Sequence, residues 1–300
     1  MANTEFEQLE KMLRRRRKPL ATAERRLAYD ELGTLFPTAD DVEREFVRIG
    51  EASAEWTTTK EAREDSAILY LHGGGYVYGS LESHRHLASE LGRSAGARTL
   101  ALDYRRAPEA PFPAALDDAV AAWRYLLDKG HRPDRLAIAG DSAGGGLAVA
   151  MMVQLRELSL PQPMCGILFS PWVDMHAAGP SYDANAARDP VVGRDIITFC
   201  ALQYLGEGNG DNPMTSPVRA NLRGIAPLTI FAGAGETLLD DSIQLARAAG
   251  LADVQVRLEI WPDVVHIWPT YHQIFSPGRK ALLQAGRVIR DAMVGSSVGH

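Results

Sequence analysis

A serine between small residues stands where the sequence predicts that a strand turns into a helix. Gly140-Asp141-Ser142-Ala143-Gly144 follows the short apolar run 136–139 and opens a helical stretch at 144–158. A serine on such a sharp turn takes a strained backbone, and only residues that are nearly free of side chain fit beside it. The helix N-terminus favours the negative charge that develops when a serine attacks a carbonyl. Ser142 is therefore predicted to be a nucleophile, although a glycine-rich turn in any doubly wound protein has the same form.

A run of three glycines follows an earlier predicted strand. His72-Gly73-Gly74-Gly75 comes just after the apolar run 67–71. Such glycines let the backbone approach a ligand and turn its N–H groups inward, which is how an oxyanion hole is made. A loop that cradles a phosphate would also use glycines, but no GxGxxG or Walker pattern follows. A permissive turn without a function is the other alternative.

The general base that a serine nucleophile needs is predicted to be His266. It follows the predicted strand 254–260, late in the chain, where the order serine, acid, histidine requires it. The other seven histidines do not fit, because His72 belongs to the glycine loop and the rest follow no suitable strand.

The acid that orients this histidine is predicted among three carboxylates. They follow the strand 228–231 in the segment 233–241. Glu236 lies closest to the strand end and ranks first, and Asp240 ranks second. Asp241 ranks last, because it precedes a helical run that holds Gln244 and resembles a helix N-cap with a capping box.

Short apolar runs alternate with helical stretches along most of the chain. This rhythm predicts βαβ units and a mostly parallel sheet covered on both faces, hence an α/β fold. Segment 42–59 contains two weaker strand candidates, consistent with an exposed antiparallel edge. Further runs are expected as strands at 98–102 and 165–169, and as helices at 83–95, 113–127 and 279–293.

The 300 residues are expected to form one domain, residues 1–300, with a cap or lid. The cap is expected from the helical first 40 residues and from 174–223, a segment rich in Pro, Gly, Asp and Asn around one helical piece at 194–204. Such an excursion at the carboxyl ends of parallel strands covers a site.

Composition excludes several classes of protein. Hydrophobic residues make up 46% of the chain, enough for a sizeable core, and the formal net charge of −6 argues against a partner nucleic acid. Cys165 and Cys200 have no CxxC or metal-ligand spacing. Because the N-terminus has no signal-type apolar stretch and no segment is long enough to span a bilayer, we expect a reduced, cytoplasmic protein without stable membrane association.

Taken together, the motifs resemble those of the hormone-sensitive-lipase family of bacterial esterases, also called the α/β-hydrolase fold-3 group. The likeness covers nearly all of the chain after about residue 42, and the pair HGGG and GDSAG is its most specific part. The matching stretches are HGGGYVYGS at 72–80, DYRRAPEAPFPAALDDA at 103–119, GDSAGGGLA at 140–148, SPWVD at 170–174, RDP at 188–190, GAGETLLDDS at 233–242 and PDVVHIWP at 262–269.

The resemblance implies an α/β-hydrolase fold with a helical cap, and in several members a homodimer through the last sheet edge. It implies that Ser142 is the nucleophile, that His266 is the base, and that Gly74, Gly75 and Ala143 supply the N–H groups of the oxyanion hole. Many relatives have Asp where this chain has Glu236, although some carry Glu.

The expected chemistry is hydrolysis of a small-molecule ester through an acyl-enzyme, which needs neither a cofactor nor a metal. The rate should climb with pH through an imidazole pKa of about 6.5. The family favours short- to medium-chain acyl esters, with lactones as further substrates.

The residues of the substrate pocket and the function of the protein each leave alternatives. Tyr76, Tyr78, Trp172 and Trp268 lie near the motifs and either line an apolar substrate pocket or belong to the core. A non-catalytic small-molecule receptor on the same fold is one alternative function, against which the presence of His266 argues. An amide or peptide hydrolase that uses the same triad is another.

Overall fold

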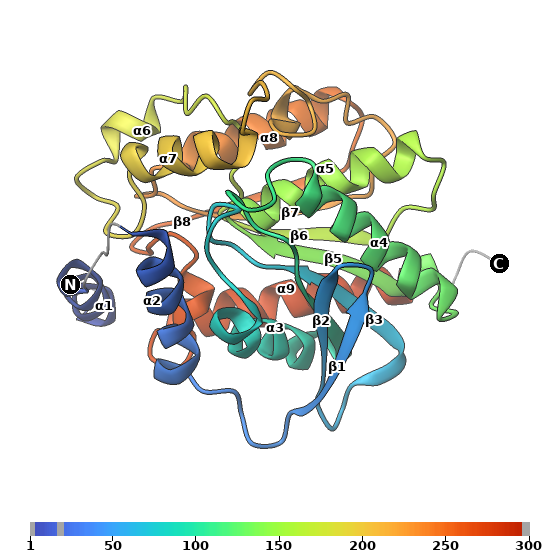
Figure 1. Cartoon of the computed structure of the whole chain (residues 1–300). Helices are drawn as coiled ribbons and strands as arrows, with labels where there is room; N and C mark the ends of the chain where they lie inside the picture. The colour runs from blue at the N-terminus through green and yellow to red at the C-terminus, as the bar shows by residue number, and fades with distance from the viewer. Residues whose placement is uncertain (1–3, 17–20, 296–300) are drawn as a thin grey trace.

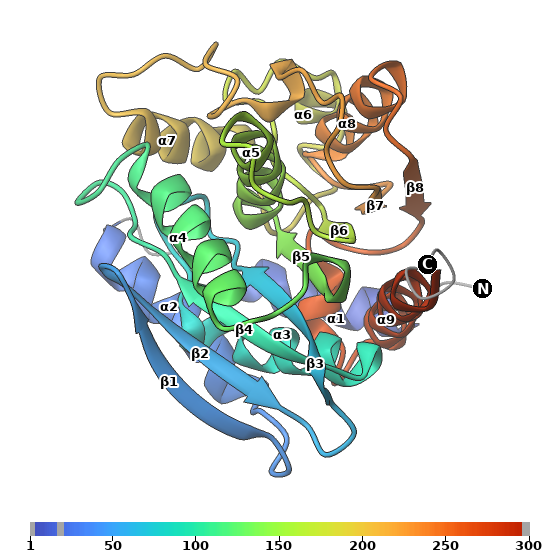
Figure 2. The same ribbon diagram turned by 90° about the vertical axis from the view of Figure 1, so that its right-hand side faces the viewer.

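One twisted sheet organises the molecule (Figures 1 and 2). A computed structural model describes residues 4–16 and 21–295, and these form eight strands in the order β1-β2-β4-β3-β5-β6-β7-β8. β1 and β4 both pair antiparallel with β2, and all other neighbours are parallel, as the alternation predicted. The strands are β1 (Glu43–Ile49), β2 (Ala52–Thr58), β3 (Arg63–Leu71), β4 (Ala97–Asp103), β5 (Leu136–Asp141), β6 (Cys165–Phe169), β7 (Leu228–Gly233) and β8 (Val256–Trp261).

Burial along the strands explains their sequences. Every residue of β5 and β6 is buried, because helices cover both faces of the sheet there, and both strands are nearly continuous apolar runs. β1 forms an edge, and only Ile49 of its seven residues is buried. Of the two strands predicted in segment 42–59, β1 is therefore the exposed antiparallel edge, whereas β2 lies inside the sheet and five of its seven residues are buried.

Helices cover the two faces of the sheet (Figures 1 and 2). α3 and α9 pack on one face around Ile68 and Tyr70, while α4, α5 and α8 pack on the other around Leu69 and Leu71. These helices are α3 (Leu81–Ala95), α4 (Ala114–Asp128), α5 (Ala143–Glu157), α8 (Leu239–Leu251) and α9 (Ser276–Gly295), and short 3₁₀ turns occur at Pro133–Arg135, Pro217–Arg219 and Trp268–Tyr271. The predicted α/β class is confirmed.

The remaining helices belong to the two segments expected to form a cap. α2 (Thr22–Leu35) lies beside α3, and α1 (Thr4–Arg15) contacts the start of α9, where Glu5 accepts from the Ser276 N–H. α6 (Ser181–Ala184) and α7 (Arg194–Leu205) lie on the opposite side of the sheet (Figure 1). Leu9, Leu13 and Leu32 are buried against the same core as α3 and α9. Residues 1–3 and 17–20 of the predicted cap lie outside the described residues.

Candidate active site

Ser142 lies on the sharp turn between β5 and α5. Its backbone has φ 50° and ψ −122°, a conformation that L-residues rarely adopt. The turn packs directly on the end of β3, because a Cβ on Gly144 would lie 2.0 Å from the carbonyl oxygen of Leu71. The flanking glycine is therefore required by a close approach of two backbones, and the Ser142 side chain is held at the start of a helix.

A chain of hydrogen bonds leads from Ser142 to a buried carboxylate. His266 Nε2 lies 3.0 Å from Ser142 Oγ, and His266 Nδ1 lies 3.0 Å from Glu236 Oε2. Glu236 follows β7 and His266 follows β8, so parallel strands deliver both side chains to one edge of the sheet. With Nδ1–H donating to Glu236, Nε2 is free to accept the serine proton.

The carboxylate raises the proton affinity of the imidazole. Burial favours the neutral form of His266, but the hydrogen bond and the charge of Glu236 outweigh burial and raise the pKa of His266 above its ordinary value. Burial also raises the pKa of Glu236, and hydrogen bonds from His266 and Ser170 oppose that rise. The raised pKa makes His266 a stronger base.

The two other carboxylates of this segment lie in different surroundings. Asp240 Oδ2 accepts a hydrogen bond from the backbone N–H of Ser181, on the cap side. Asp241 Oδ1 accepts from the backbone N–H groups of Val173 and Asp174. The N-cap prediction for Asp241 is wrong, because α8 already begins at Leu239 and the carboxylate turns toward the neighbouring loop instead.

The glycine loop faces Ser142 from the end of β3. Gly74 and Gly75 have φ of 108° and 64°, and both line the cavity beside Ser142. A Cβ on Gly75 would lie 2.6 Å from the Cys200 sulfur, so the backbone must be bare there. Ala143 begins α5, where the first N–H groups of a helix have no intrahelical acceptor. The three residues thus stand where an oxyanion hole is predicted.

A buried polar cluster supports this loop from below. Asp141 Oδ1 accepts hydrogen bonds from Tyr70 Oη at 2.7 Å and from the Gly73 N–H at 3.1 Å, and His84 Nε2 lies 3.4 Å from Asp141 Oδ2. The Tyr104 hydroxyl donates to the His72 carbonyl, and its ring stacks on the His72 ring. The residue before the predicted nucleophile therefore holds the predicted oxyanion loop.

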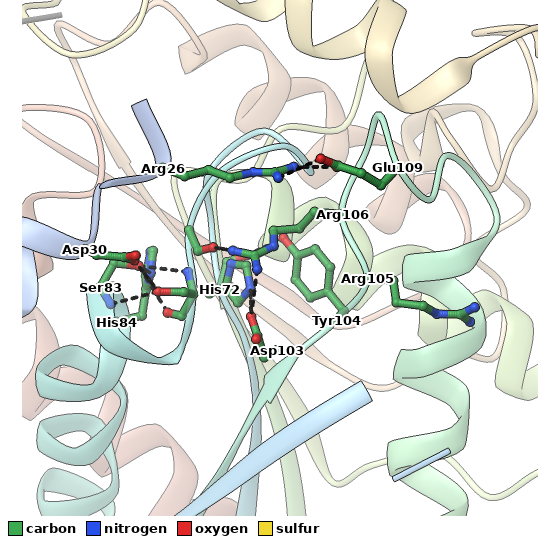
Figure 3. A network of polar contacts seen from close by, with 12 residues as sticks. Arg26, Asp30, His72, Ser83, His84, Asp103, Tyr104, Arg105, Arg106 and Glu109 are labelled. Carbon is green, nitrogen blue, oxygen red and sulfur yellow. Dashed lines mark hydrogen bonds and ion pairs between the residues drawn. The ribbon is translucent and has the colours of Figure 1, made fainter. Parts of the chain in front are cut away.

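Charged side chains tie the same loop to helix α2 (Figure 3). Arg26 Nε donates to the carbonyl of Val77, and Arg26 Nη2 donates to the carbonyl of Ala107, both at 2.8 Å. The Arg26 guanidinium also pairs with Glu109, and Ser80 Oγ donates to Asp30. α2 is thus anchored on the loop that carries Gly74 and Gly75.

The cavity beside Ser142 is small and adjoins a larger one. It measures about 40 Å³, and its lining includes Ser142, His266, Val192, Ile197 and Cys200. A second cavity of about 150 Å³ lies between α1, α2 and the segment around α7. The two share Tyr29, Val191, Ile196 and Ile267. The predicted nucleophile therefore faces a mostly apolar, two-part space under the N-terminal helices.

Of the aromatic residues near the motifs, one lines the cavity beside Ser142 and three belong to the core. Tyr78 lines the cavity beside Ser142. Tyr76 stacks on Tyr204 with ring centroids 3.8 Å apart, Trp172 donates to the Asp174 carbonyl, and Trp268 is wholly buried. Tyr76, Trp172 and Trp268 do not line either described cavity, because their rings pack into the core behind the loops.

Sequence reasoning missed Asp189, which links the cavity wall to the acid loop. Asp189 Oδ1 accepts from the N–H groups of Val191 and Val192, and Oδ2 accepts from the Thr237 N–H. Its charge also raises the pKa of His266. The RDP motif at 188–190 was the available signal, but nothing in the sequence showed that it meets residue 237.

The described residues contain no cluster of three or more His, Cys, Asp or Glu side chains suited to a metal. Among those same residues, no helix is both long and apolar enough to cross a membrane. Cys165 and Cys200 are both buried free thiols.

Comparisons with known proteins agree with this geometry. A family model described as the alpha/beta hydrolase fold matches residues 68–270. An acetyl-hydrolase of Streptomyces hygroscopicus is 43% identical over 89% of each chain. The crystal structure of an esterase from the bacterial hormone-sensitive lipase family is 42% identical, with a TM-score of 0.95 over 98% of this chain and 99% of that chain. EstE5, soaked with p-nitrophenyl butyrate, is 41% identical, with a TM-score of 0.95 over 98% of this chain and 100% of that chain.

The chain therefore belongs to the alpha/beta hydrolase family, among its carboxylesterases. The resemblance expected from the sequence motifs is confirmed.

Proposed function

We propose that this chain hydrolyses short- to medium-chain acyl esters through an acyl-enzyme on Ser142. The observation that carries the proposal is the continuous hydrogen-bonded chain from Ser142 through His266 to Glu236, buried beside an apolar cavity. The Streptomyces relative is named an acetyl-hydrolase, and EstE5 was soaked with a butyrate ester; both names support small acyl groups.

The reaction follows from the positions of these groups. Ser142 Oγ attacks the ester carbonyl carbon while its proton passes to His266 Nε2. The N–H groups of Gly74, Gly75 and Ala143 hold the oxyanion, and each such donor contributes about 3 kcal/mol to lowering the barrier. The bond to the alcohol oxygen then breaks, and the alkoxide takes the proton from Nε2. Water repeats the sequence and releases the acid, so neither cofactor nor metal takes part.

We assign the small cavity to the acyl group. At about 40 Å³, it holds few carbon atoms, and Val192, Ile197 and Cys200 close it. The adjoining cavity of about 150 Å³ gives the remainder of the substrate an apolar surface under α1 and α2. We therefore treat residues 1–300 as one domain whose cap comes from segments 1–40 and 174–223.

An acyl series tests this assignment. The kcat/KM of the wild-type protein on p-nitrophenyl esters, from acetate to decanoate, should peak at the short chains and fall by about tenfold or more at decanoate. Lactones extend the series to cyclic esters. A maximum at decanoate would contradict the acyl assignment of the small cavity.

Matched ester and anilide substrates separate the alternatives. The ester of a given acyl group should be cleaved faster than its p-nitroanilide, and the reverse order would identify an amide hydrolase. A receptor would bind such ligands without turnover. The distance of 3.0 Å between Ser142 and His266 argues against a receptor, since a receptor has no use for a poised base.

A further inference from the structure

The segment that follows β6 contacts the loops of all three members of the proposed triad. The Phe169 carbonyl accepts from the Ser142 N–H, and the Trp172 N–H donates to the Ser142 carbonyl, both at 2.9 Å. Between them, the Ser170 N–H donates to the Phe231 carbonyl in β7, the strand that leads to Glu236. Three residues within the segment 169–172 thus fasten the Ser142 turn to the neighbouring strand β7.

The Ser170 hydroxyl adds the acid and the histidine loop to this junction. Ser170 Oγ donates to Glu236 Oε1 at 2.7 Å and accepts from the Ile267 N–H at 3.1 Å. Ile267 directly follows His266 in the chain. One buried hydroxyl therefore bonds to the carboxylate on one side and to the backbone beside the imidazole on the other.

These bonds decide which carboxylate oxygen faces His266. Glu236 Oε1 also accepts from the Gly233 N–H at 2.5 Å, so two donors hold Oε1 and leave Oε2 for His266 Nδ1. Glu has one more rotatable bond than Asp, and without these donors its carboxylate would be free to swing away. The longer acid in this chain therefore needs a fixed partner on Oε1.

The backbone of Ser170 is strained. Its φ is 48°, a left-handed conformation that is uncommon for residues other than glycine, and the side chain is wholly buried. Glycine would relieve that strain but would remove the hydroxyl. A serine at this position is thus explained by its side-chain bonds rather than by its backbone.

We propose that Ser170 is a positioning residue, which holds the Glu236 carboxylate and the His266 loop in the relative positions that proton transfer requires. The proposal rests on the proposed function, because it assigns Ser170 a part in the same triad. Ser170 acts through Glu236 and His266 and lines neither described cavity, so its loss should lower kcat and leave KM nearly unchanged.

Two variants separate the hydroxyl from the backbone. Ser170→Ala and Ser170→Gly both remove the hydroxyl, and only the glycine relieves the left-handed strain. Both should lower the kcat for p-nitrophenyl butyrate by roughly 10- to 100-fold, with KM changed by less than about threefold, because a buried bond to a charged group is lost. Recovery of kcat in Ser170→Gly would overturn the proposal in favour of a backbone effect.

Ser216 supplies a matched control. Its hydroxyl is also fully buried, donates to the Gly210 carbonyl and accepts from the Met175 N–H, yet it lines neither described cavity. Ser216→Ala should lose thermal stability while its kcat stays within about twofold of the wild type. Equal losses of kcat in Ser216→Ala and Ser170→Ala would reduce Ser170 to a structural role.

A double-mutant cycle identifies the partner through which Ser170 acts. In a Glu236→Ala background, Ser170→Ala should cost less than about threefold, because there is no carboxylate left to position. Fully additive losses would contradict the proposal, as would a kcat of Ser170→Ala within threefold of the wild type while Ser142→Ala is inactive. Turnover that survives Ser142→Ala would instead defeat the proposed function, so the two failures are distinguishable.

Discussion

The proposed chemistry depends on one buried carboxylate next to one imidazole. Glu236 is wholly buried, and its carboxylate lies 3.0 Å from His266 Nδ1. That charge outweighs burial and raises the pKa of His266. Activity should therefore fall, on the acid side of the pH profile, at a pH above the ordinary imidazole pKa of about 6.5 that the sequence suggests.

The pH dependence of the wild type follows from this sign. A general base works in its neutral form, so activity is lost as the pH falls through the raised pKa of His266. The acid limb of kcat/KM, measured between pH 5 and 9 on p-nitrophenyl butyrate, should therefore lie above about 6.5. In Glu236→Gln the limb should move to lower pH, because the charge that raised the pKa is gone. The same limb in both proteins would contradict the assignment of Glu236.

Motifs located some of these residues and not others. Ser142 and His266 were predicted because each follows a recognisable strand in a fixed order. Glu236 ranked ahead of Asp240 only because it lies closer to the strand end. The N-cap prediction for Asp241 failed because the start of α8 cannot be placed to within a residue from the sequence. Ser170 and Asp189 act across contacts between segments far apart in the chain, which no local pattern records.

Two elements support the proposed oxyanion loop. Asp141 on the nucleophile turn holds the Gly73 N–H, and Arg26 on α2 holds the carbonyls of Val77 and Ala107. The sequence predicted both the loop and the N-terminal helices, but not that one anchors the other. That contact depends on a guanidinium reaching two carbonyls in two different loops.

Removal of the Arg26 contact should loosen α2 over the cavity. Arg26→Ala should raise the KM for p-nitrophenyl butyrate several-fold more than it lowers kcat, because α2 carries Tyr29 on the cavity wall while the triad stays in place. Glu109→Gln is the matched control, since it keeps both carbonyl contacts of Arg26. The Glu109 side chain is 64% exposed, so its ion pair contributes little, and both constants should stay near the wild type. A larger effect in Glu109→Gln would contradict this account.

In the whole molecule, helices cover both faces of the sheet, which explains why the strands appear in the sequence as apolar runs. The alternation of apolar runs and helices predicted the fold class, and β5 and β6 are apolar throughout because they are central. The position of β4 between β2 and β3 was not predictable, since strand order depends on how the strands are connected rather than on local sequence pattern. Helix α3, which packs on the sheet beside α9, carries His84 and His86 into the interior.

His86 illustrates the consequence for stability. Burial lowers the pKa of His86 to about 3, so the folded protein keeps it neutral while the unfolded chain takes up a proton below about 6.5. Stability from this group is present above pH 6.5 and is lost as the pH falls toward 3. At pH 5 the loss amounts to about 2 kcal/mol.

His86→Gln should remove that pH dependence. Its free energy of unfolding, measured by urea titration relative to the wild type, should improve by about 2 kcal/mol between pH 7.5 and pH 5. Gln also offers an N–H to the Thr270 carbonyl, 3.0 Å from His86 Nε2. A constant difference between the two proteins at both pH values would show that His86 titrates normally in the folded state.

The role of Ser142 as the nucleophile is tested by the hydrolysis of p-nitrophenyl butyrate by wild type and by Ser142→Ala at equal concentrations of folded protein. We expect turnover by the wild type and a loss of at least about 1,000-fold in the variant, because the attacking oxygen is gone while the fold is kept. Turnover that survives in Ser142→Ala would assign the chemistry to another nucleophile. No turnover by the wild type would favour a binding protein on the same fold.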